Sequence, residues 1–424
     1  MEFIHRDDAL LIPLAEPSRR NGRARFLISY GGVPADGLRI GPNRHGQRSF
    51  FSNNWPNRAR HWLPTVDHPY DKATSEFVVT APDHYQVVSN GLLVEETDLP
   101  GGLRRTHWRQ RVPIATWLFA LGVTRFAVEH REPFGSVPIQ TWVFQEDRDE
   151  GFRDFAVPTR SVLGFYAERV GPFAYEKVAN VQSTSVGGGM EAATAIFYAE
   201  ESVTGERAER WRRVIIHELA HHWFGNAVTE YDWDDVWLSE GFATYFTLLY
   251  IEHADGRDAF VDALRDARRG VVEFYRENPD YRTVHADLDD MSRVTSYPGI
   301  YQKGAWVLHM LRRRVGDSAF WEGIRLYYAR HMNGNATTED FRLAMEGASG
   351  DDLEGFFRQW LLEGGIPTLS GRWAHDAERG VVRVELRQVG PRTFRLPVEV
   401  GVHLPGRERP RVGTTTLTDR RGSL

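Results

Sequence analysis

The chain has 424 residues, of which 41% are hydrophobic and 26% charged, and its formal net charge is −6 at pH 7. This length allows two or three domains, and the composition is ordinary for a water-soluble globular protein. The 58 acidic residues outnumber the 52 basic ones, and no basic stripe is present, which argues against nucleic acid as a partner. The chain contains no cysteine, which excludes disulfides and thiolate metal sites.

No transmembrane segment is expected, because the longest apolar run, at about 114–123, is too short to span a bilayer. No signal peptide is visible at the N-terminus. The sequence as it stands therefore predicts a cytoplasmic protein, and a secreted or periplasmic one if the N-terminus is truncated. Nothing in the sequence indicates an oligomeric state.

Residues 1–134 are predicted to form a β-rich, sandwich-like domain that begins abruptly. Short apolar runs separated by turn residues are typical of such domains. Asn90-Gly91 is a strong signal for a hairpin turn before a strand at 92–94. Further strands are expected at 25–30, 77–80, 86–88, 107–112 and 116–123.

Residues 135–366 are predicted to form a second domain that begins with a strand at 139–144 and a helix at 152–169. Gly188, Gly189, Met190 and Glu191 follow. Glycines beside an edge strand allow a ligand to approach the backbone closely, and Glu191 would then project into a cleft. Taken alone, this segment is equally compatible with a tight turn that carries an exposed glutamate.

The segment 214–246 carries the clearest chemical signal. His217 and His221 are four residues apart, so on a helix they share one face and can chelate one Zn²⁺. Glu218 lies beside the first histidine, where it can polarise a metal-bound water. Glu240, eighteen residues beyond His221, would complete a His₂Glu site from a second helix. Three protein ligands leave one position open, as in catalytic zinc sites.

The alternative is that this histidine pair belongs to an ordinary core helix. The apolar residues at 214–216 and at 219–220 do indicate a buried helix. Buried polar side chains without partners are costly, so a metal is the natural partner of the pair. His222 lies about 100° round the helix from His221, and we expect it to pack or to support the site rather than to bind the metal.

The remainder of the second domain is predicted to be mostly helical, and the chain is predicted to end in a short β segment, 367–424. Thr337 or Thr338 is a plausible helix N-cap. Residues 382–387 alternate as a strand does, although so short a segment is expected to be unable to supply a partner sheet. Helices are expected over 305–311, 320–328, from 338 onward, and over 353–362.

Four motifs together resemble the M1 family of zinc aminopeptidases, a branch of the gluzincins. His-Glu-Leu-Ala-His (217–221), followed after eighteen residues by Glu240 in Trp-Leu-Ser-Glu-Gly-Phe-Ala, resembles the family's metal motif. Gly-Gly-Met-Glu (188–191) is similar to its exopeptidase motif, and Tyr-Gln-Lys-Gly (301–304) to the motif that carries its catalytic tyrosine. Trp-Leu-Pro (62–64) and the segment 113–117 resemble its N-terminal domain. The motifs occur in the family's order.

The resemblance implies a multidomain α+β fold with a thermolysin-like, mostly α-helical catalytic domain. It implies one Zn²⁺ held by His217, His221 and Glu240, with Glu218 as general base and Tyr301 as oxyanion donor. Glu191 would hold the amine of a peptide that has a free N-terminus. Ala192 and Ser239 stand where the family usually has asparagine, which bears on how the substrate and Glu240 are held.

The lead hypothesis is therefore a zinc aminopeptidase. The alternatives are a gluzincin with endopeptidase or epoxide-hydrolase activity, and a catalytically silent zinc-binding scaffold. The Gly-Gly-Met-Glu motif argues against a pure endopeptidase, and the intact ligands, base and tyrosine argue against a silent scaffold. Residues near Gln182 and Met190 are expected to line part of the pocket for the first substrate residue.

Overall fold

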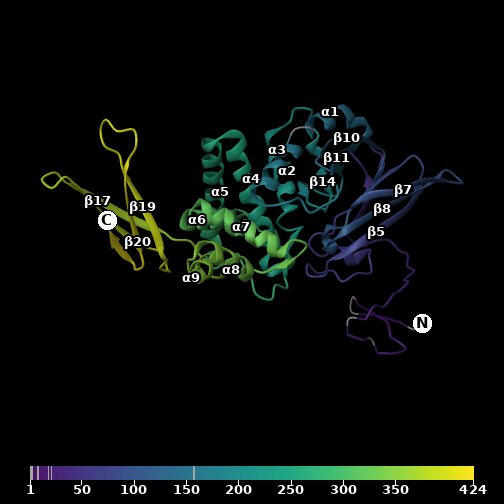
Figure 1. Cartoon of the computed structure of the whole chain (residues 1–424), viewed down its shortest axis with the longest axis horizontal. Helices are drawn as coiled ribbons and strands as arrows, with labels where there is room; N and C mark the ends of the chain where they lie inside the picture. Colours follow the sequence, from purple (N-terminus) through teal and green to yellow (C-terminus); the bar gives the residue numbers. More distant parts are fainter. Residues whose placement is uncertain (1–2, 7–8, 18, 21, 156–157) are drawn as a thin grey trace.

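A computed structural model describes residues 3–6, 9–17, 19–20, 22–155 and 158–424. Figure 1 shows three regions side by side: N-terminal strands, a central mixed and helical region, and C-terminal strands at the far end. This arrangement confirms the predicted multidomain α+β architecture. Within the described residues, no helix combines the length and the apolarity that crossing a lipid bilayer requires.

Two antiparallel sheets form most of the N-terminal region, one in the order β3-β4-β9-β6 and the other in the order β5-β8-β7. On β8, alternate residues Thr106, Trp108 and Gln110 are buried, as expected for a strand with one face on a core. A short hairpin of β1 and β2 precedes the sheets. The strands are β1 Ile4–Arg6, β2 Ala9–Leu11, β3 Leu38–Pro42, β4 Arg48–Ser52, β5 Ala73–Pro82, β6 Gln86–Ser89, β7 Leu92–Leu99, β8 Leu103–Ile114 and β9 Leu121–Thr124.

Three local predictions for this region were wrong. Residues 25–30 form no strand, because no neighbouring strand pairs with them and they are exposed. Thr116–Leu118 is a turn of 3-10 helix, and the strand begins only at Leu121. Asn90-Gly91 makes no hairpin, because β6 and β7 belong to different sheets. Gly91 instead lets the chain cross close to β8, where an added Cβ would lie 1.9 Å from the carbonyl oxygen of Arg109.

A mixed sheet in the order β10-β11-β12-β14-β13 begins the central region. β11, β12 and β14 run parallel, and β13 lies antiparallel to β14 at the edge. The expected boundary at 134/135 falls in the hairpin between β10 and β11, so this sheet begins at Phe126. Its strands are β10 Phe126–Phe134, β11 Val137–Phe144, β12 Val178–Ser183, β13 Gly189–Met190 and β14 Ala195–Ala199.

The helix predicted over 152–169 is two helices, α1 and α2. Residues 156–157 of that prediction lie outside the described residues, and Pro158, which lacks an amide proton, stands directly before α2. The predicted N-cap is confirmed, since Thr337 and Asp340 form a capping box. The helices are α1 Arg148–Asp154, α2 Thr159–Arg169, α3 Glu209–His221, α4 Trp237–Asp255, α5 Arg257–Glu277, α6 Lys303–Val315, α7 Asp317–His331, α8 Thr338–Ser349 and α9 Glu354–Phe357.

Wider helical turns precede α6 and follow α9. Tyr297–Gln302 and Arg358–Leu362 are π-helical, so Tyr301 lies in a π turn rather than at the start of a regular helix. Such turns are frequent at functional sites. Two short parallel strands, β15 Val228–Glu230 and β16 Gly334–Ala336, join the segment after α3 to the segment after α7.

The C-terminal segment forms two small sheets, β17-β18-β21 and β19-β20. The expectation that it is too short to supply a partner sheet was therefore wrong. Leu396 and Leu417 pair across β19 and β20 and are buried. The strands are β17 Leu369–Asp376, β18 Val381–Gln388, β19 Leu396–Val402, β20 Arg411–Leu417 and β21 Arg421–Ser423.

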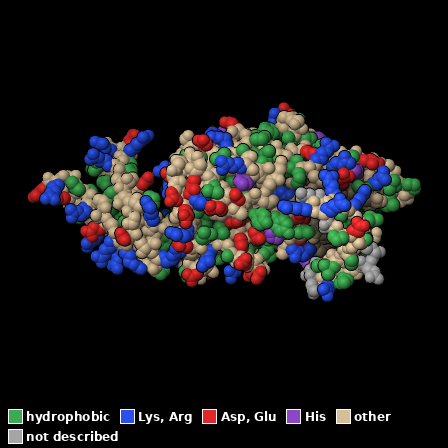
Figure 2. Space-filling view, turned by 60° about the horizontal axis from the view of Figure 1, so that its bottom comes forward, with side chains coloured by type: hydrophobic (Ala, Val, Ile, Leu, Met, Phe, Trp, Pro, Cys, Tyr) green, Lys and Arg blue, Asp and Glu red, His purple; other side chains and the backbone are tan. Residues whose placement is uncertain are grey.

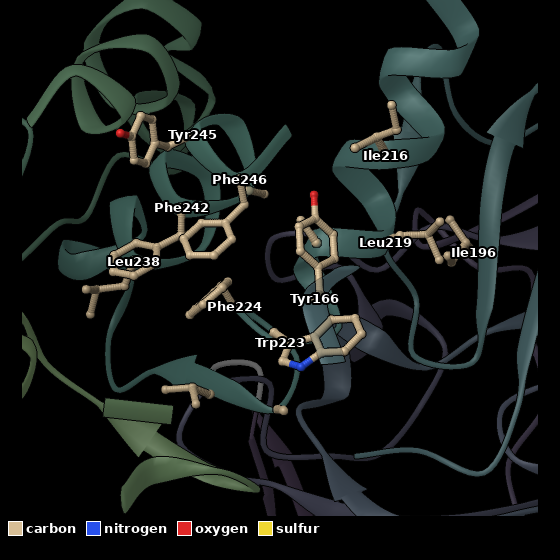
Figure 3. Close-up of a cluster of buried hydrophobic side chains, with 14 of the residues drawn as sticks. Tyr166, Ile196, Ile216, Leu219, Trp223, Phe224, Leu238, Phe242, Tyr245 and Phe246 are labelled. Atoms are coloured by element: carbon tan, nitrogen blue, oxygen red, sulfur yellow. The ribbon is translucent and has the colours of Figure 1, made fainter. Parts of the chain in front are cut away.

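An aromatic cluster fixes α3 against α4 (Figure 3). The ring of Phe224, just after α3, lies 4.9 Å from Phe242 and 4.5 Å from Phe246, both on α4. Trp223 packs against Tyr166 of α2 at 5.4 Å. Close-packed interiors resist small displacements, so this cluster holds the two helices in one relative position.

Candidate active site

The predicted metal ligands come together at the crossing of α3 and α4. Nε2 of His217 and Nε2 of His221 are 3.0 Å apart. Oε2 of Glu240, in the first turn of α4, lies 3.4 Å from the first nitrogen and 3.3 Å from the second. A tetrahedral zinc with bonds of about 2.0–2.1 Å needs donor atoms spaced by roughly this much. These residues therefore fit a zinc ion.

The electrostatics of Glu240 also fit a cation. Its Oε2 is buried and forms no hydrogen bond with any described residue, although it faces two imidazoles. Burial alone would raise the pKa of Glu240, but the charge of His221 and the two imidazole nitrogens that face Oε2 outweigh burial and lower the pKa to about 2. The carboxylate is thus held in its ionised, metal-binding form.

Glu218 and Glu191 lie beside this group. Carboxylate oxygens of both converge with a nitrogen of His221 within 4.8 Å of one another. Burial raises the pKa of Glu218 well above its ordinary value and that of Glu191 to about 7, and each is raised further by nearby carboxylates. Oε1 of Glu191 has no hydrogen-bond partner among the described residues, so it can accept a donor from a ligand.

The glycine segment forms the opposite wall, where β13 is an edge strand as predicted. Gly189 lies against Glu218, since an added Cβ would come within 2.1 Å of Glu218 Oε1. Nothing lies within 4 Å of such an atom at Gly187 or Gly188, which leaves the edge open to a ligand. Nδ2 of Asn226 donates to the carbonyl oxygen of Glu191 at 2.7 Å and holds the end of the strand.

Tyr301 approaches the ligands from the π turn before α6. Its ring stacks on that of His217, with centroids 6.1 Å apart and planes 10° apart. Burial, together with the charges of Glu240 and Glu191, raises the pKa of Tyr301 well above its ordinary value. The hydroxyl therefore stays protonated at neutral pH and can donate a hydrogen bond.

His222 and Gln182 lie away from the convergent group. His222 accepts a hydrogen bond from the amide of Thr194 at 3.2 Å, and burial lowers its pKa to about 3. Residues near Gln182 and Met190 were expected to line part of the pocket for the first substrate residue; Ser185, Val186 and Met190 do line the cleft, whereas Gln182 itself does not. Its amide instead donates to Asp147 Oδ2 at 2.7 Å and accepts from the amide of Phe144 at 2.9 Å.

Sequence reasoning missed several residues of the cleft. Arg58 and Arg213 line the cleft. Arg213 precedes His217 by four residues, so its place on the same helix face was open to prediction. Arg58 belongs to an N-terminal loop, and only tertiary packing brings it here. Other lining residues are Asn53, Trp55, Ser185, Val186, Val214, Thr244, Thr247, Leu248, Ile251 and Tyr297.

Comparison with known sequences matches both main regions. Residues 4–118 match the family model of the peptidase M1 N-terminal domain, and residues 159–360 match that of the peptidase family M1 domain. Aminopeptidase N of Streptomyces lividans is 31% identical over 351 residues, which cover 78% of this chain and 40% of that protein. Glutamyl aminopeptidase of Bos taurus is 30% identical over 377 residues, which cover 84% and 39%.

A solved structure shows the same fold. Legionella pneumophila aminopeptidase A, in complex with aspartic acid, is 20% identical with a TM-score of 0.77, over 93% of this chain and 46% of that one. The chain spans about a third to two fifths of the length of the curated relatives it matches, since the share is 34% for glutamyl aminopeptidase of Bitis rhinoceros and 40% for the Streptomyces protein. The motifs, the two matched domains and the fold agree: the chain belongs to peptidase family M1.

Proposed function

We propose that the protein is a zinc-dependent aminopeptidase that hydrolyses the first peptide bond of peptides with a free N-terminus. The observation that carries the proposal is the convergence of three donor atoms, from His217, His221 and Glu240, 3.0–3.4 Å apart. A general base, a protonated phenol and an unpaired buried carboxylate surround that point. Metal-assisted peptide hydrolysis uses a metal, a general base and an oxyanion donor, and the unpaired carboxylate suits the free amine of a substrate.

Each residue has one role in the proposed reaction. Zinc, when bound, lowers the pKa of a coordinated water to about 7 and polarises the scissile carbonyl. Glu218, made more basic by burial, accepts the proton of the attacking water and delivers it to the leaving nitrogen. Tyr301 donates a hydrogen bond to the developing oxyanion, a contribution of about 3–4 kcal/mol in comparable sites.

Glu191 accounts for exopeptidase action. Its free Oε1 lies 3.9 Å from Nδ1 of His221, so the carboxylate lies beside one of the proposed metal ligands. A substrate ammonium paired with this carboxylate brings only the first peptide bond to the metal. An endopeptidase does not bind a substrate amine and so does not require a buried carboxylate at this point. A silent scaffold does not catalyse hydrolysis and so does not require Glu218 or Tyr301.

Arg58 bears on the first substrate residue. The N-terminal region packs on the loop after His221, where Trp55 contacts Trp233 at 6.1 Å and Lys72 donates to the carbonyls of Asn226 and Ala227. Arg58 comes from this region and is a cation in the same cleft as Glu191. Relatives of this chain are named glutamyl aminopeptidases, and a cation here supports an acidic first residue as part of the proposal.

Replacement of Glu191 tests the proposal. Peptides that begin with Glu, Ala, Leu or Lys, each with its N-acetylated twin, are incubated with wild type and Glu191→Gln. Wild type should cleave only the free amines, one residue at a time by mass spectrometry, and the variant should show a sharply raised KM. Internal cleavage of both forms by wild type would contradict the proposal.

A further inference from the structure

The cleft carries a second arginine, Arg213, on the side where the departing peptide must leave. Besides the carboxylates and imidazoles at the metal position, Arg58 and Arg213 are the charged residues that line the described cleft. Arg213 belongs to α3 and stands one turn before His217, on the same face. Its side chain is 44% exposed, so it borders the open cleft.

The axis of α3 gives the order of the subsites. Glu191 approaches its C-terminal end, because Oε1 lies 3.9 Å from Nδ1 of His221. Tyr301 stacks on His217 in the middle. The ring of Tyr297 lies 5.2 Å from that of Tyr301. Burial raises the pKa of Tyr297, and the positive charge of Arg213 acts in the opposite direction, which shows that Arg213 is near Tyr297. Arg213 thus lies across the metal position from Glu191.

A bound peptide must follow this order. With its ammonium at Glu191 and its first carbonyl at the metal position, the second residue lies beyond His217, beside Arg213. The edge of β13 is consistent with this path, because the open positions Gly187 and Gly188 precede Gly189, which lies against Glu218.

The guanidinium of Arg213 has N–H groups available to bind a ligand. Its Nε donates to Glu209 Oε1 at 3.1 Å in an exposed pair four residues apart. Among the described residues, neither of its terminal nitrogens has a hydrogen-bond partner. A guanidinium with free terminal N–H groups matches the two oxygens of a carboxylate.

We propose that Arg213 binds a carboxylate carried by the second residue of the substrate, so that the enzyme favours peptides in which Asp or Glu follows the scissile bond. The inference rests on the proposed aminopeptidase function. The terminal carboxylate of a dipeptide could also bind Arg213. The test below therefore distinguishes a side-chain carboxylate from a terminal one.

The test compares C-terminally amidated tetrapeptides X-Glu-Ala-Ala, X-Gln-Ala-Ala and X-Lys-Ala-Ala, with X the preferred first residue. Wild type should show kcat/KM about two- to fivefold higher for Glu than for Gln, the range that an exposed ion pair gives, with Lys lowest. The Glu-to-Gln ratio should fall in high salt. The dipeptide X-Gln and its amide measure the contribution of a terminal carboxylate separately.

Variants assign the effect to one side chain. Arg213→Gln should bring the Glu-to-Gln ratio to about one, and Arg213→Glu should reverse the order of Glu and Lys. Arg210→Gln is the matched control, because Arg210 lies on the same helix but stacks on Trp211 and does not line the cleft; it should keep the wild-type ratio.

Failure has distinct forms. Equal kcat/KM for the three tetrapeptides in wild type, or a ratio that persists in Arg213→Gln, would overturn this inference alone. A preference seen only for the free-acid dipeptide would assign Arg213 to terminal carboxylates and overturn the side-chain selectivity. No hydrolysis of any peptide would overturn the proposed function and this inference with it.

Discussion

The hydroxyl oxygen of Ser239 lies 3.0 Å from Nδ1 of His221, the ring nitrogen that faces away from the metal position. The carbonyl oxygen of Phe224 lies 3.1 Å from the same nitrogen. Both can accept the Nδ1 proton, which leaves Nε2 free to bind a metal. Contacts of this kind fix the tautomer and orientation of a ligand histidine.

Ser239→Ala should therefore weaken zinc binding without abolishing it. The Phe224 carbonyl still holds the ring, so we expect a loss of about tenfold, the lower end of the range for such contacts. Competition with a chromophoric chelator measures the affinity directly. An unchanged zinc affinity would show that Ser239 contributes nothing to the orientation of His221.

Glu218→Gln should retain one zinc per chain and lose turnover. The amide keeps the shape of the side chain but removes the proton acceptor, so kcat should fall by about 10²–10⁴. Metal analysis after dialysis, beside the rate, separates loss of base from loss of metal. Turnover close to wild type would remove Glu218 from the general-base role.

Tyr301→Phe should lower kcat/KM by about 10²–10³ while the zinc content stays the same. The phenyl ring can keep the stack on His217, so the change isolates the hydroxyl. Steady-state rates with one peptide measure the loss. A fall smaller than about threefold would show that this hydroxyl contributes little to oxyanion stabilisation.

Asp235→Asn should stabilise the fold at pH 8 and have little effect near pH 4. Burial raises the pKa of Asp235 to about 6, despite a hydrogen bond accepted from the Thr338 hydroxyl. The folded state therefore favours the protonated carboxyl, and this stability is lost as pH rises from about 4 through about 6. The variant has no proton to lose and should gain roughly 1–3 kcal/mol at pH 8.

Urea unfolding of the metal-free protein at both pH values measures this difference. A variant that gains as much stability at pH 4 as at pH 8 would show that the cause is not ionisation of Asp235.

Local sequence was enough to group two of the candidate metal ligands, because the spacing of His217 and His221 is periodic on one helix. α-Helical geometry alone predicts that His217 and His221 lie on one face, and it predicts the same face for Arg213. Contacts between distant segments were beyond such reasoning. Asn226, which holds Glu191, comes from a loop, and Arg58 reaches the cleft through packing of the N-terminal region.

In the fold, too, local patterns were predicted from the sequence and contacts between distant segments were not. Strands and helices with a clear period were confirmed, such as 139–144 in β11 and 320–328 in α7. The Asn90-Gly91 turn was misassigned because its pairing partners lie far along the chain, where β6 joins β9 and β7 joins β8. On the face shown in Figure 2, acidic and basic side chains are interspersed, which agrees with the low net charge read from the sequence.

The most direct test of a zinc-dependent aminopeptidase is the hydrolysis of aminoacyl-p-nitroanilides beside their N-acetylated twins, before chelation, after it, and after zinc is restored. The account predicts cleavage of the free amines alone, lost on chelation and recovered with one Zn²⁺ per chain. Cleavage that survives chelation in metal-free protein would contradict it.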